Sequence, residues 1–206
     1  MPSNATFLEV KNAFQSIAGL ESLTAADEFF LTSSLNRAVY RAYNESDSWP
    51  RYLVVGESRL ILTDPAATVP YAEAAKETIG EFLRIHRTQP FLRNSVVEFE
   101  FYVDSAGAHI LNLTTSDSTS VFVTYKKELQ TNFTPDSTDI PGEFVDYIIY
   151  TALSDFYTGD GQTDKAAMAA AQAKIMLDIE LLRLDKKANN NTINKKFSTY
   201  VNRQSR

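Results

Sequence analysis

The segment 140–187 constrains the fold most, because its apolar spacing and its helix breakers predict two helices packed as a hairpin. Pro141 suits the first turn of a helix, where the N–H that proline lacks would be unpaired anyway. Gly159 and Gly161 can adopt the left-handed conformation that ends a helix. Thr163 is expected to cap the second helix through its hydroxyl. A long helical hairpin at 134–187 follows from these signals.

The second of these helices has an unusual distribution of apolar residues. Alanines are frequent between Ala166 and Ala173, which lets another helix approach closely. Larger apolar residues form two stripes, one with Met168, Ile175, Ile179 and Leu182 and the other with Leu177, Leu181 and Leu184. Both faces of this helix therefore need a partner, either within the hairpin or in a neighbouring subunit.

Two more helices are predicted near the N-terminus. Thr6 with Glu9, and Thr24 with Asp27, have the spacing of capping boxes, and Gly19 can close the first helix. The apolar positions that follow share one helical face in each case. They are Phe7, Leu8, Val10, Phe14 and Ile17 in the first helix, and Phe30, Leu35, Ala38, Val39, Ala42 and Tyr43 in the second. Pro50 is expected to stop the second helix by holding Trp49 extended.

The middle of the chain changes to a β-type pattern. Segments 52–55 and 59–62 flank Gly56-Glu57-Ser58 and predict a hairpin. Strict alternation makes 96–103 the clearest strand. Further strands are expected at 79–87, 110–113 and 121–125, with a turn at 104–107.

These patterns together predict an α+β fold. We expect a helical bundle, made of the N-terminal helices and the long C-terminal hairpin, with a small antiparallel β region inserted and an extended C-terminal tail. The expected boundaries are N-terminal helices at 1–50, the β region at 51–133, the hairpin at 134–187 and a basic docking tail at 188–206.

The C-terminal tail differs in charge from the rest of the chain. Segment 183–206 has seven Lys and Arg residues and one Asp, a net charge of +6. Because the whole chain has a net charge of −6, the remainder carries −12. Asn189 to Asn191 are expected to break the helix. Beyond them, Ile193, Phe197, Tyr200 and Val201 share the face of a short amphipathic helix, which is marginal in water without a partner.

Docking to a second protein explains both the charge and the apolar face of the tail, whereas binding to DNA or lipid explains only the charge. A basic polar terminus is otherwise a solvated end. The candidate docking residues are Lys186, Lys187, Ile193, Lys195, Lys196, Phe197, Tyr200, Val201, Arg203 and Arg206.

The sequence disfavours most catalytic chemistry. Cysteine is absent, which excludes disulfides, thiolate metal sites and a cysteine nucleophile. His86 and His109 have no second ligand at metal-binding spacing, so each is interpreted as a surface or strand-edge residue. Asp160, Gln162 and Asp164 alternate like the start of a calcium loop, but Lys165 stands where its glycine belongs. We therefore expect no enzymatic activity, metal or cofactor.

Membrane insertion and secretion are not expected either. No window approaches the roughly 18 apolar residues that span a membrane. The N-terminus lacks the basic and apolar regions of a signal peptide, which indicates synthesis in the cytosol.

Several segments resemble the head-to-tail connector family of tailed phages, the adaptors that join a portal ring to the tail, and the related tail tubular protein A. The C-terminal matches are IPGEFVDY at 140–147, ALSDFY at 152–157, DGQTDKA at 160–166 and the alanine-rich helix. A weaker N-terminal match comprises LNRA at 35–38 and Trp49-Pro50. The resemblance spans most of the chain as a pattern, without a diagnostic motif.

The resemblance implies a structural virion protein, located in the neck of the particle and in the host cytoplasm during assembly. The resemblance further implies a ring of twelve copies between the portal protein and the tail or nozzle proteins. DNA would pass through the ring without sequence-specific binding. The alternatives are a β-domain binding module that holds a tail fibre or a glycan, and an enzyme with an unfamiliar site; the loops at 105–120 lack the aromatic residues that would favour a binding module.

Overall fold

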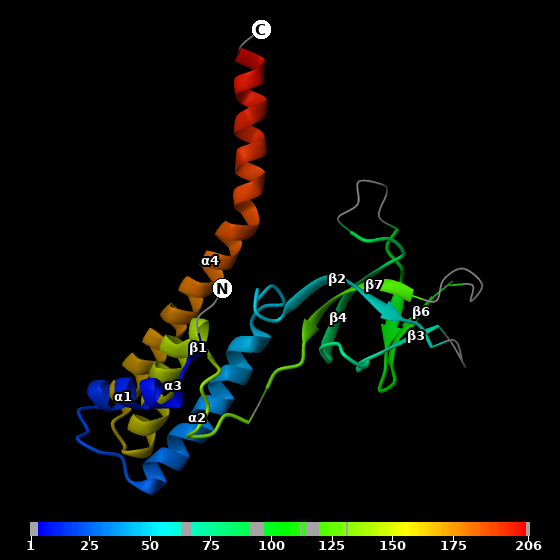
Figure 1. Ribbon diagram of the computed structural model, residues 1–206. Helices are drawn as coiled ribbons and strands as arrows, with labels where there is room; N and C mark the ends of the chain where they lie inside the picture. Colours follow the sequence, from blue (N-terminus) through cyan, green and yellow to red (C-terminus); the bar gives the residue numbers. More distant parts are fainter. Residues whose placement is uncertain are drawn as a thin grey trace. The chain divides into compact units, whose positions relative to one another are not determined.

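The computed structural model describes residues 4–62, 67–90, 97–111, 113, 120–130 and 132–204, with side chains up to 186. The predicted mixed α+β class is confirmed: the described residues form four α-helices and three small antiparallel sheets (Figure 1). The chain divides into two compact units, Met1–Ser46 with Gln130–Arg206, here called the helical unit, and Asp47–Leu129, here called the β unit.

Helices α1 (Phe7–Ala18) and α2 (Ala25–Asn44) begin where the capping boxes predict. The Thr6 N–H donates to Glu9 Oε2 at 2.7 Å, and the Glu9 N–H donates to Thr6 Oγ1 at 3.2 Å. Thr24 and Asp27 repeat this reciprocal pair. Gly19 ends α1 in the left-handed conformation, with φ at 72°. These local predictions are confirmed.

The predicted core faces of α1 and α2 are partly wrong. Leu8 and Ile17 are exposed, because only one edge of the predicted α1 stripe lies against the protein. In α2 Phe30 is half-buried while Leu31, which the pattern missed, is fully buried. The other residues predicted for the core face of α2 are buried as expected, namely Leu35, Ala38, Val39, Ala42 and Tyr43. Helix α2 ends at Asn44, well before Pro50.

The chain enters its third helix by a route that the sequence did not predict. Strand β1 (Asn4–Ala5) pairs with β8 (Ile140–Pro141), so Pro141 lies in a two-residue strand rather than in a helical turn. A 3₁₀ turn, η1 (Gly142–Phe144), then leads into α3 (Val145–Gly159). Gly161 has φ at 74° as expected, whereas Gly159 remains within the helix.

Helix α4 (Thr163–Gln204) is continuous, so the break predicted at Asn189 to Asn191 is wrong. Asparagine costs a helix only about 0.7 kcal/mol per residue relative to alanine, far less than proline. Thr163 is the first residue of α4 rather than its cap.

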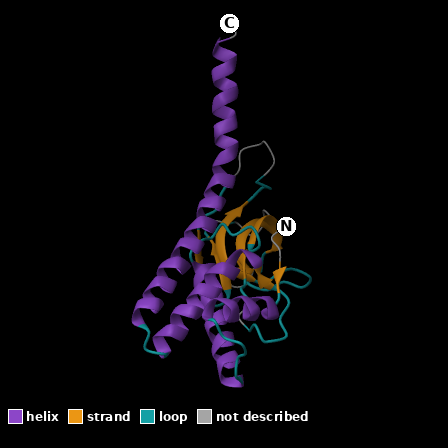
Figure 2. Ribbon diagram, turned by 90° about the vertical axis from the view of Figure 1, so that its left-hand side faces the viewer, coloured by secondary structure: helices purple, strands orange, loops and turns teal. Residues whose placement is uncertain are grey.

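Helix α3 is the centre of the helical unit. Helices α1, α2 and α4 all pack on it (Figure 2). Phe14 of α1 meets Phe156 of α3 edge to face, with 5.7 Å between ring centroids. Ala166, Ala169 and Ala173 of α4 are buried, and the Ser154 hydroxyl donates to the Ala166 carbonyl at 3.0 Å. The alanines therefore allow the close approach that the sequence predicts.

Asn36 of α2 fixes the place where the chain returns from the β unit to the helical unit. Its Nδ2 donates to the carbonyls of Thr32 and Phe133, at 2.9 and 3.0 Å, and its Oδ1 accepts from the Phe133 N–H at 2.9 Å. Both backbone polar groups of the buried Phe133 are thus satisfied by one side chain.

We therefore expect Asn36→Asp to lower the free energy of unfolding by about 1–3 kcal/mol, because the new carboxylate would face two carbonyl oxygens. Urea unfolding followed by far-UV circular dichroism measures this loss. Asn12→Asp on the exposed side of α1 adds the same charge and is the control. Equal effects of the two substitutions would show that the Asn36 clamp contributes nothing.

The β unit contains two three-stranded antiparallel sheets. The first has the order β2 (Leu53–Leu60), β7 (Ser120–Lys127) and β4 (Ile79–His86). The second has the order β3 (Thr68–Pro70), β6 (Gly107–Ile110) and β5 (Phe101–Val103). Their shared core includes Val69, Ile79, Ile85, Ala108, Val121, Val123 and Tyr125.

The predicted strands of the β unit have mixed outcomes. Those at 79–87 and 121–125 are confirmed as β4 and β7, and the turn at 104–107 connects β5 to β6. The predicted hairpin at 52–62 is wrong: Gly56, with φ at 65°, lies at a bulge inside the single strand β2. The strand predicted at 96–103 is reduced to β5, with a separate bridge between Glu98 and His86. The strand predicted at 110–113 is wrong in its bounds, because β6 ends at Ile110. The sequence did not predict β3.

Candidate functional site

A groove of about 330 Å³ opens in the helical unit between α2, α3 and α4. Its apolar wall consists of Ala170, Ala173, Leu177 and Leu181 of α4. The groove exists because alanines stand where larger side chains would fill the space beside α3. Its rim carries exposed charges of both signs, namely Arg41, Glu45, Lys174 and Asp178.

Thr151 of α3 is the most distinctive residue of this groove. Its side chain lines the groove, yet the residue is only 8% exposed and its hydroxyl has no hydrogen-bond partner within the described part of the chain. A buried hydroxyl without a partner costs about 1–3 kcal/mol. The oxygen of this hydroxyl is itself buried, so a molecule in the groove does not reach it unless the neighbouring side chains move.

An ion pair holds the α2 and α3 walls of the groove together. Arg37 Nη2 donates to Asp155 Oδ2 at 2.9 Å, and the buried Ser34 hydroxyl donates to the same oxygen at 3.0 Å. Arg37 Nη2 also donates to Ser34 Oγ at 3.1 Å. Arg37 and Asp155 are partly exposed, so the pair contributes to alignment of the helices more than to stability.

A second feature of α4 is an exposed apolar face, here called the α4 stripe, formed by Met168, Ile175, Ile179 and Leu182. These side chains are 74%, 49%, 39% and 57% exposed. Leu177, of the other predicted stripe, is buried, and Leu181 and Leu184 are half-buried. Of the two predicted stripes, only the one with Leu177, Leu181 and Leu184 therefore packs against the rest of the protein.

The predicted docking tail has no described side-chain geometry beyond Lys186, which is exposed. The backbone of 187–204 continues α4, but the side chains of Lys187, Ile193, Lys195, Lys196, Phe197, Tyr200, Val201 and Arg203 lie outside the described residues, as does all of Arg206. The docking role of these residues stays a prediction.

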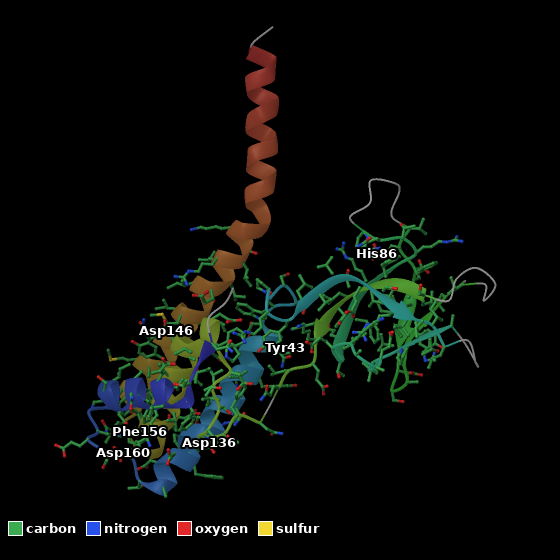
Figure 3. The ribbon with its side chains drawn as sticks, in the orientation of Figure 1. Tyr43, His86, Asp136, Asp146, Phe156 and Asp160 are labelled. Carbon is green, nitrogen blue, oxygen red and sulfur yellow. The ribbon has the colours of Figure 1, made fainter. Side chains whose placement is uncertain are left out.

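The inter-helix turn contains the three polar residues that alternate like a calcium loop. Asp160 lies between α3 and α4, at the opposite end of α3 from Asp146 (Figure 3). Gln162 Nε2 donates to Asp160 Oδ2, and Asp164 belongs to the first turn of α4. The side chains thus serve the turn, as the sequence predicts, and the described residues contain no cluster that could hold a metal ion.

Both histidines are buried, which corrects their interpretation as surface residues, although His86 does lie on an edge strand, β4. His109 lies on β6, the central strand of its sheet. Its Nδ1 is 2.8 Å from Thr68 Oγ1 and its Nε2 is 2.9 Å from Asp104 Oδ2, while Tyr102 stacks on the ring. The sequence missed this cluster, since its members meet only when β3, β6 and β5 pair.

Strand pairing brings the aspartate, the histidine and the threonine of this cluster together. Thr68 and His109 are register partners on β3 and β6, and Asp104 lies in the β5–β6 turn. The hydrogen bond from His109, followed by one from the Ala106 N–H, holds the pKa of Asp104 below its usual value. The ionised Asp104 therefore stabilises the sheet at pH values above the ordinary pKa of aspartate. This contribution is lost as the pH falls through the lowered pKa of Asp104.

Arg59 of β2 is fully buried inside the β unit. Its Nε is 2.8 Å from Glu57 Oε2, and its Nη2 donates to Tyr125 Oη and to the Glu77 carbonyl, both at 2.6 Å. The Tyr125 hydroxyl in turn donates to Glu57 Oε2 at 2.9 Å. The only sequence signal for this network was the i, i+2 spacing of Glu57 and Arg59, which places them on one face of a strand.

Burial and the hydrogen bond to Glu57 raise the pKa of Tyr125 from 10.0 to about 12. Because the folded pKa exceeds the unfolded one, this tyrosine stabilises the protein below pH 10, and we expect that contribution to disappear between pH 10 and 12. The loss should reach at most about 2–3 kcal/mol. Urea unfolding at pH 9 and pH 11 measures about half of this loss, about 1.4 kcal/mol.

Tyr125→Phe is the control for this pH dependence, since it leaves the other ionisable groups in place. The difference in stability between pH 9 and pH 11 should be smaller in Tyr125→Phe than in the unaltered protein. An identical difference in the two proteins would contradict the raised pKa. Absorbance at 295 nm gives an independent readout of the late-titrating phenol.

None of the helices in the part of the chain that the structure describes combines the length and apolar character needed to cross a membrane. A scan against models of known protein families finds no match, and a search of curated proteins finds no similar sequence.

Proposed function

We propose that this chain is a structural subunit of a tailed phage, a head-to-tail adaptor whose copies form a ring between the portal and the tail. The observation that carries the proposal is the α4 stripe, because four exposed apolar side chains on one face of a single helix mark a surface for assembly. The proposal assigns the chain no reaction, metal or cofactor.

The segments that resemble the connector family support this proposal by where they fall. The DGQTDKA match forms the turn between α3 and α4, and the alanine-rich match forms the α3-facing side of α4. LNRA at 35–38 contributes Asn36 and Arg37, which tie α2 to the re-entering chain and to α3. The matches thus coincide with contacts that organise the helical unit.

The charge distribution also fits an adaptor. Outside 183–206 the chain carries −12, and a wall of that sign repels the phosphates of DNA that slides past it. The basic end of α4, with its apolar residues, is suited to a partner protein of opposite charge. In this proposal the helical unit builds the ring, the β unit is an insertion in it, and the end of α4 docks on the portal.

Deletion of residues 186–206 is expected to leave the melting temperature nearly unchanged and to abolish capture by the portal protein of the same phage. Phe197→Ala alone should increase the rate of dissociation, while Lys195 and Lys196 make association depend on salt. Surface plasmon resonance on immobilised portal measures both rates. Ser198→Ala is the control on the same segment.

Unaltered portal affinity after the deletion would show that the tail is a solvated end. Reduced affinity in Ser198→Ala equal to that of Phe197→Ala would show that the segment does not dock through its apolar face. In both cases the docking role of the tail is wrong.

One observation favours the alternative of a β-domain binding module. Tyr102 is half exposed and stacks on His109, with 4.7 Å between the ring centroids, which makes a flat aromatic surface of the kind that sugars pack on. Binding of a phage-receptor glycan that Tyr102→Ala removes would support this alternative. Portal capture that is insensitive to Tyr102→Ala would support the adaptor.

A further inference from the structure

Strand β2 lies at one edge of its sheet, with β7 on its inner side. Just past the end of β2, Leu62 and Thr68 exchange both backbone hydrogen bonds, at 2.8 and 2.9 Å, across the outer side. Because backbone groups point to the same side of a strand at every second residue, those of Leu60 and Ser58 face outward as well. An edge of this kind pairs readily with another strand unless something covers it.

Residues 71–78, here called the strap, connect β3 to β4 and cover this edge without forming a strand. The Leu60 N–H donates to Glu73 Oε2 at 3.2 Å, and Lys76 Nζ donates to the Ser58 carbonyl. A carboxylate thus takes the place of a carbonyl and an ammonium the place of an N–H, the two groups that a neighbouring strand would offer. Glu73 and Lys76, here called the clip, also bind each other at 2.5 Å.

The clip is partly buried and charged. The Glu73 side chain is 13% exposed, and the neighbouring Glu77 carbonyl accepts from the buried Arg59 at 2.6 Å. Burial by itself would raise the pKa of Glu73, but the hydrogen bonds from Lys76 and from the Leu60 N–H, together with the charges of Lys76 and Arg59, hold it below its usual value. Glu73 is therefore an ionised acceptor at neutral pH.

The strap is held closed against backbone strain. Ala75, between the two clip residues, has φ at 64°, and within the described part of the chain it is the one residue other than glycine with a positive φ. The turn around it is closed by the Lys76 N–H, which donates to the Glu73 carbonyl at 3.1 Å. Alanine keeps such a conformation only where its surroundings impose it. Loss of the clip should therefore release the strap.

The edge beneath the strap is suited to strand pairing. Ser58 is exposed, and Leu60 and Leu62 are 55% and 53% exposed. Two copies of this edge placed antiparallel would satisfy each other's backbone groups and cover these leucines.

We infer that the clip stands in for a neighbouring strand on β2, and that when it opens this edge pairs with the same edge of a second copy of the chain. The contact is two-fold, because both copies contribute the same strand. This inference goes beyond the proposed adaptor: it concerns the β unit alone and holds whether or not the chain forms a ring.

The full-length Glu73→Ala, Lys76→Ala variant tests the inference. We expect hydrogen exchange of the Leu60 amide, followed by NMR, to be at least about tenfold faster than in the unaltered protein. Sedimentation velocity over a concentration series should show a reversible dimer at concentrations where the unaltered protein shows none. Lys174→Ala with Asp178→Ala removes one exposed base and one exposed acid from α4 and is the control, which should match the unaltered protein.

Two further variants separate the match to the strand from the ion pair itself. Glu73→Lys with Lys76→Glu keeps the pair and the net charge but presents a donor to the Leu60 N–H and an acceptor to the Ser58 carbonyl. It should behave like the double alanine variant. Adding Leu60→Lys to the double alanine variant should abolish the dimer, since a lysine on an edge strand opposes pairing.

Unchanged exchange of the Leu60 amide in a double alanine variant with native circular dichroism would overturn the inference. Faster exchange without a dimer at any concentration would overturn it too, as would a dimer that persists after Leu60→Lys. Lys76→Met, which removes only the donor, should give both changes to a smaller extent and replaces the double alanine variant if that variant does not fold.

Discussion

Gly107→Ala is expected to lower the free energy of unfolding of the β unit by about 3–5 kcal/mol. A Cβ at this position would lie 2.1 Å from the Val69 carbonyl oxygen, and the φ of 144° is one that alanine rarely adopts. Backbone strain and overpacking each cost roughly 1–3 kcal/mol. The backbone of β6 must therefore move away from β3. This movement disturbs the hydrogen bonds between the two strands, in which Val69 is paired with Ala108.

Gly159→Ala is the control for this substitution. No atom lies within 4 Å of a Cβ at Gly159, which ends α3 without a positive φ, so we expect no loss or a gain of up to about 1 kcal/mol. Urea unfolding followed by circular dichroism measures both proteins. A loss below about 1 kcal/mol in Gly107→Ala would contradict the close packing of β3 on β6.

Arg59→Ala is expected to cost about 3–5 kcal/mol. The substitution removes a fully buried cation, which takes the donor from the Tyr125 hydroxyl and the Glu77 carbonyl and the ion-pair partner from the Glu57 carboxylate. Arg84→Ala on β4, in the same sheet, is the control, because Arg84 is exposed and should change stability by less than about 0.5 kcal/mol.

A double variant separates the charge of Arg59 from its packing. Arg59→Met with Glu57→Gln replaces the ion pair by neutral groups of similar volume, and such replacements in buried pairs are often neutral. We expect the double variant to recover most of the stability that Arg59→Ala loses. Thermal unfolding measures all of these variants. If Arg59→Ala were no more destabilising than Arg84→Ala, the buried network would not stabilise the β unit.

The features that could be predicted from the sequence are those set by near neighbours in the chain. The capping boxes at Thr6 and Thr24 and the end of α1 at Gly19 depend on residues three or four positions apart, and all three are confirmed. The β-branched and aromatic residues at 121–125 likewise predict β7, because such residues favour strands.

The errors arise where distant segments decide the outcome. Gly56 reads locally as a hairpin turn, but pairing of the whole of β2 with β7 converts it into a bulge. Pro141 suits a helix start, yet pairing with β1 keeps it extended. His109 and Arg59 acquire their partners only when strands far apart in sequence meet, so no local pattern signals them.

The candidate site shows the same division. The two stripes of α4 could be predicted from spacing, but which stripe α3 covers depends on tertiary packing. The groove could not be predicted, since three helices form it and the unpartnered state of Thr151 follows from what lies around it.

The central claim is that copies of this chain assemble on a portal, and electron microscopy of the two proteins together tests it most directly. The portal protein of the same phage is mixed with an excess of this chain, and negatively stained particles are averaged end-on and side-on. The adaptor account predicts an additional ring of density on one end of every saturated portal, absent when residues 186–206 are deleted. Portals that stay bare at saturating concentration, or that carry this chain on their outer wall without a ring, would contradict it.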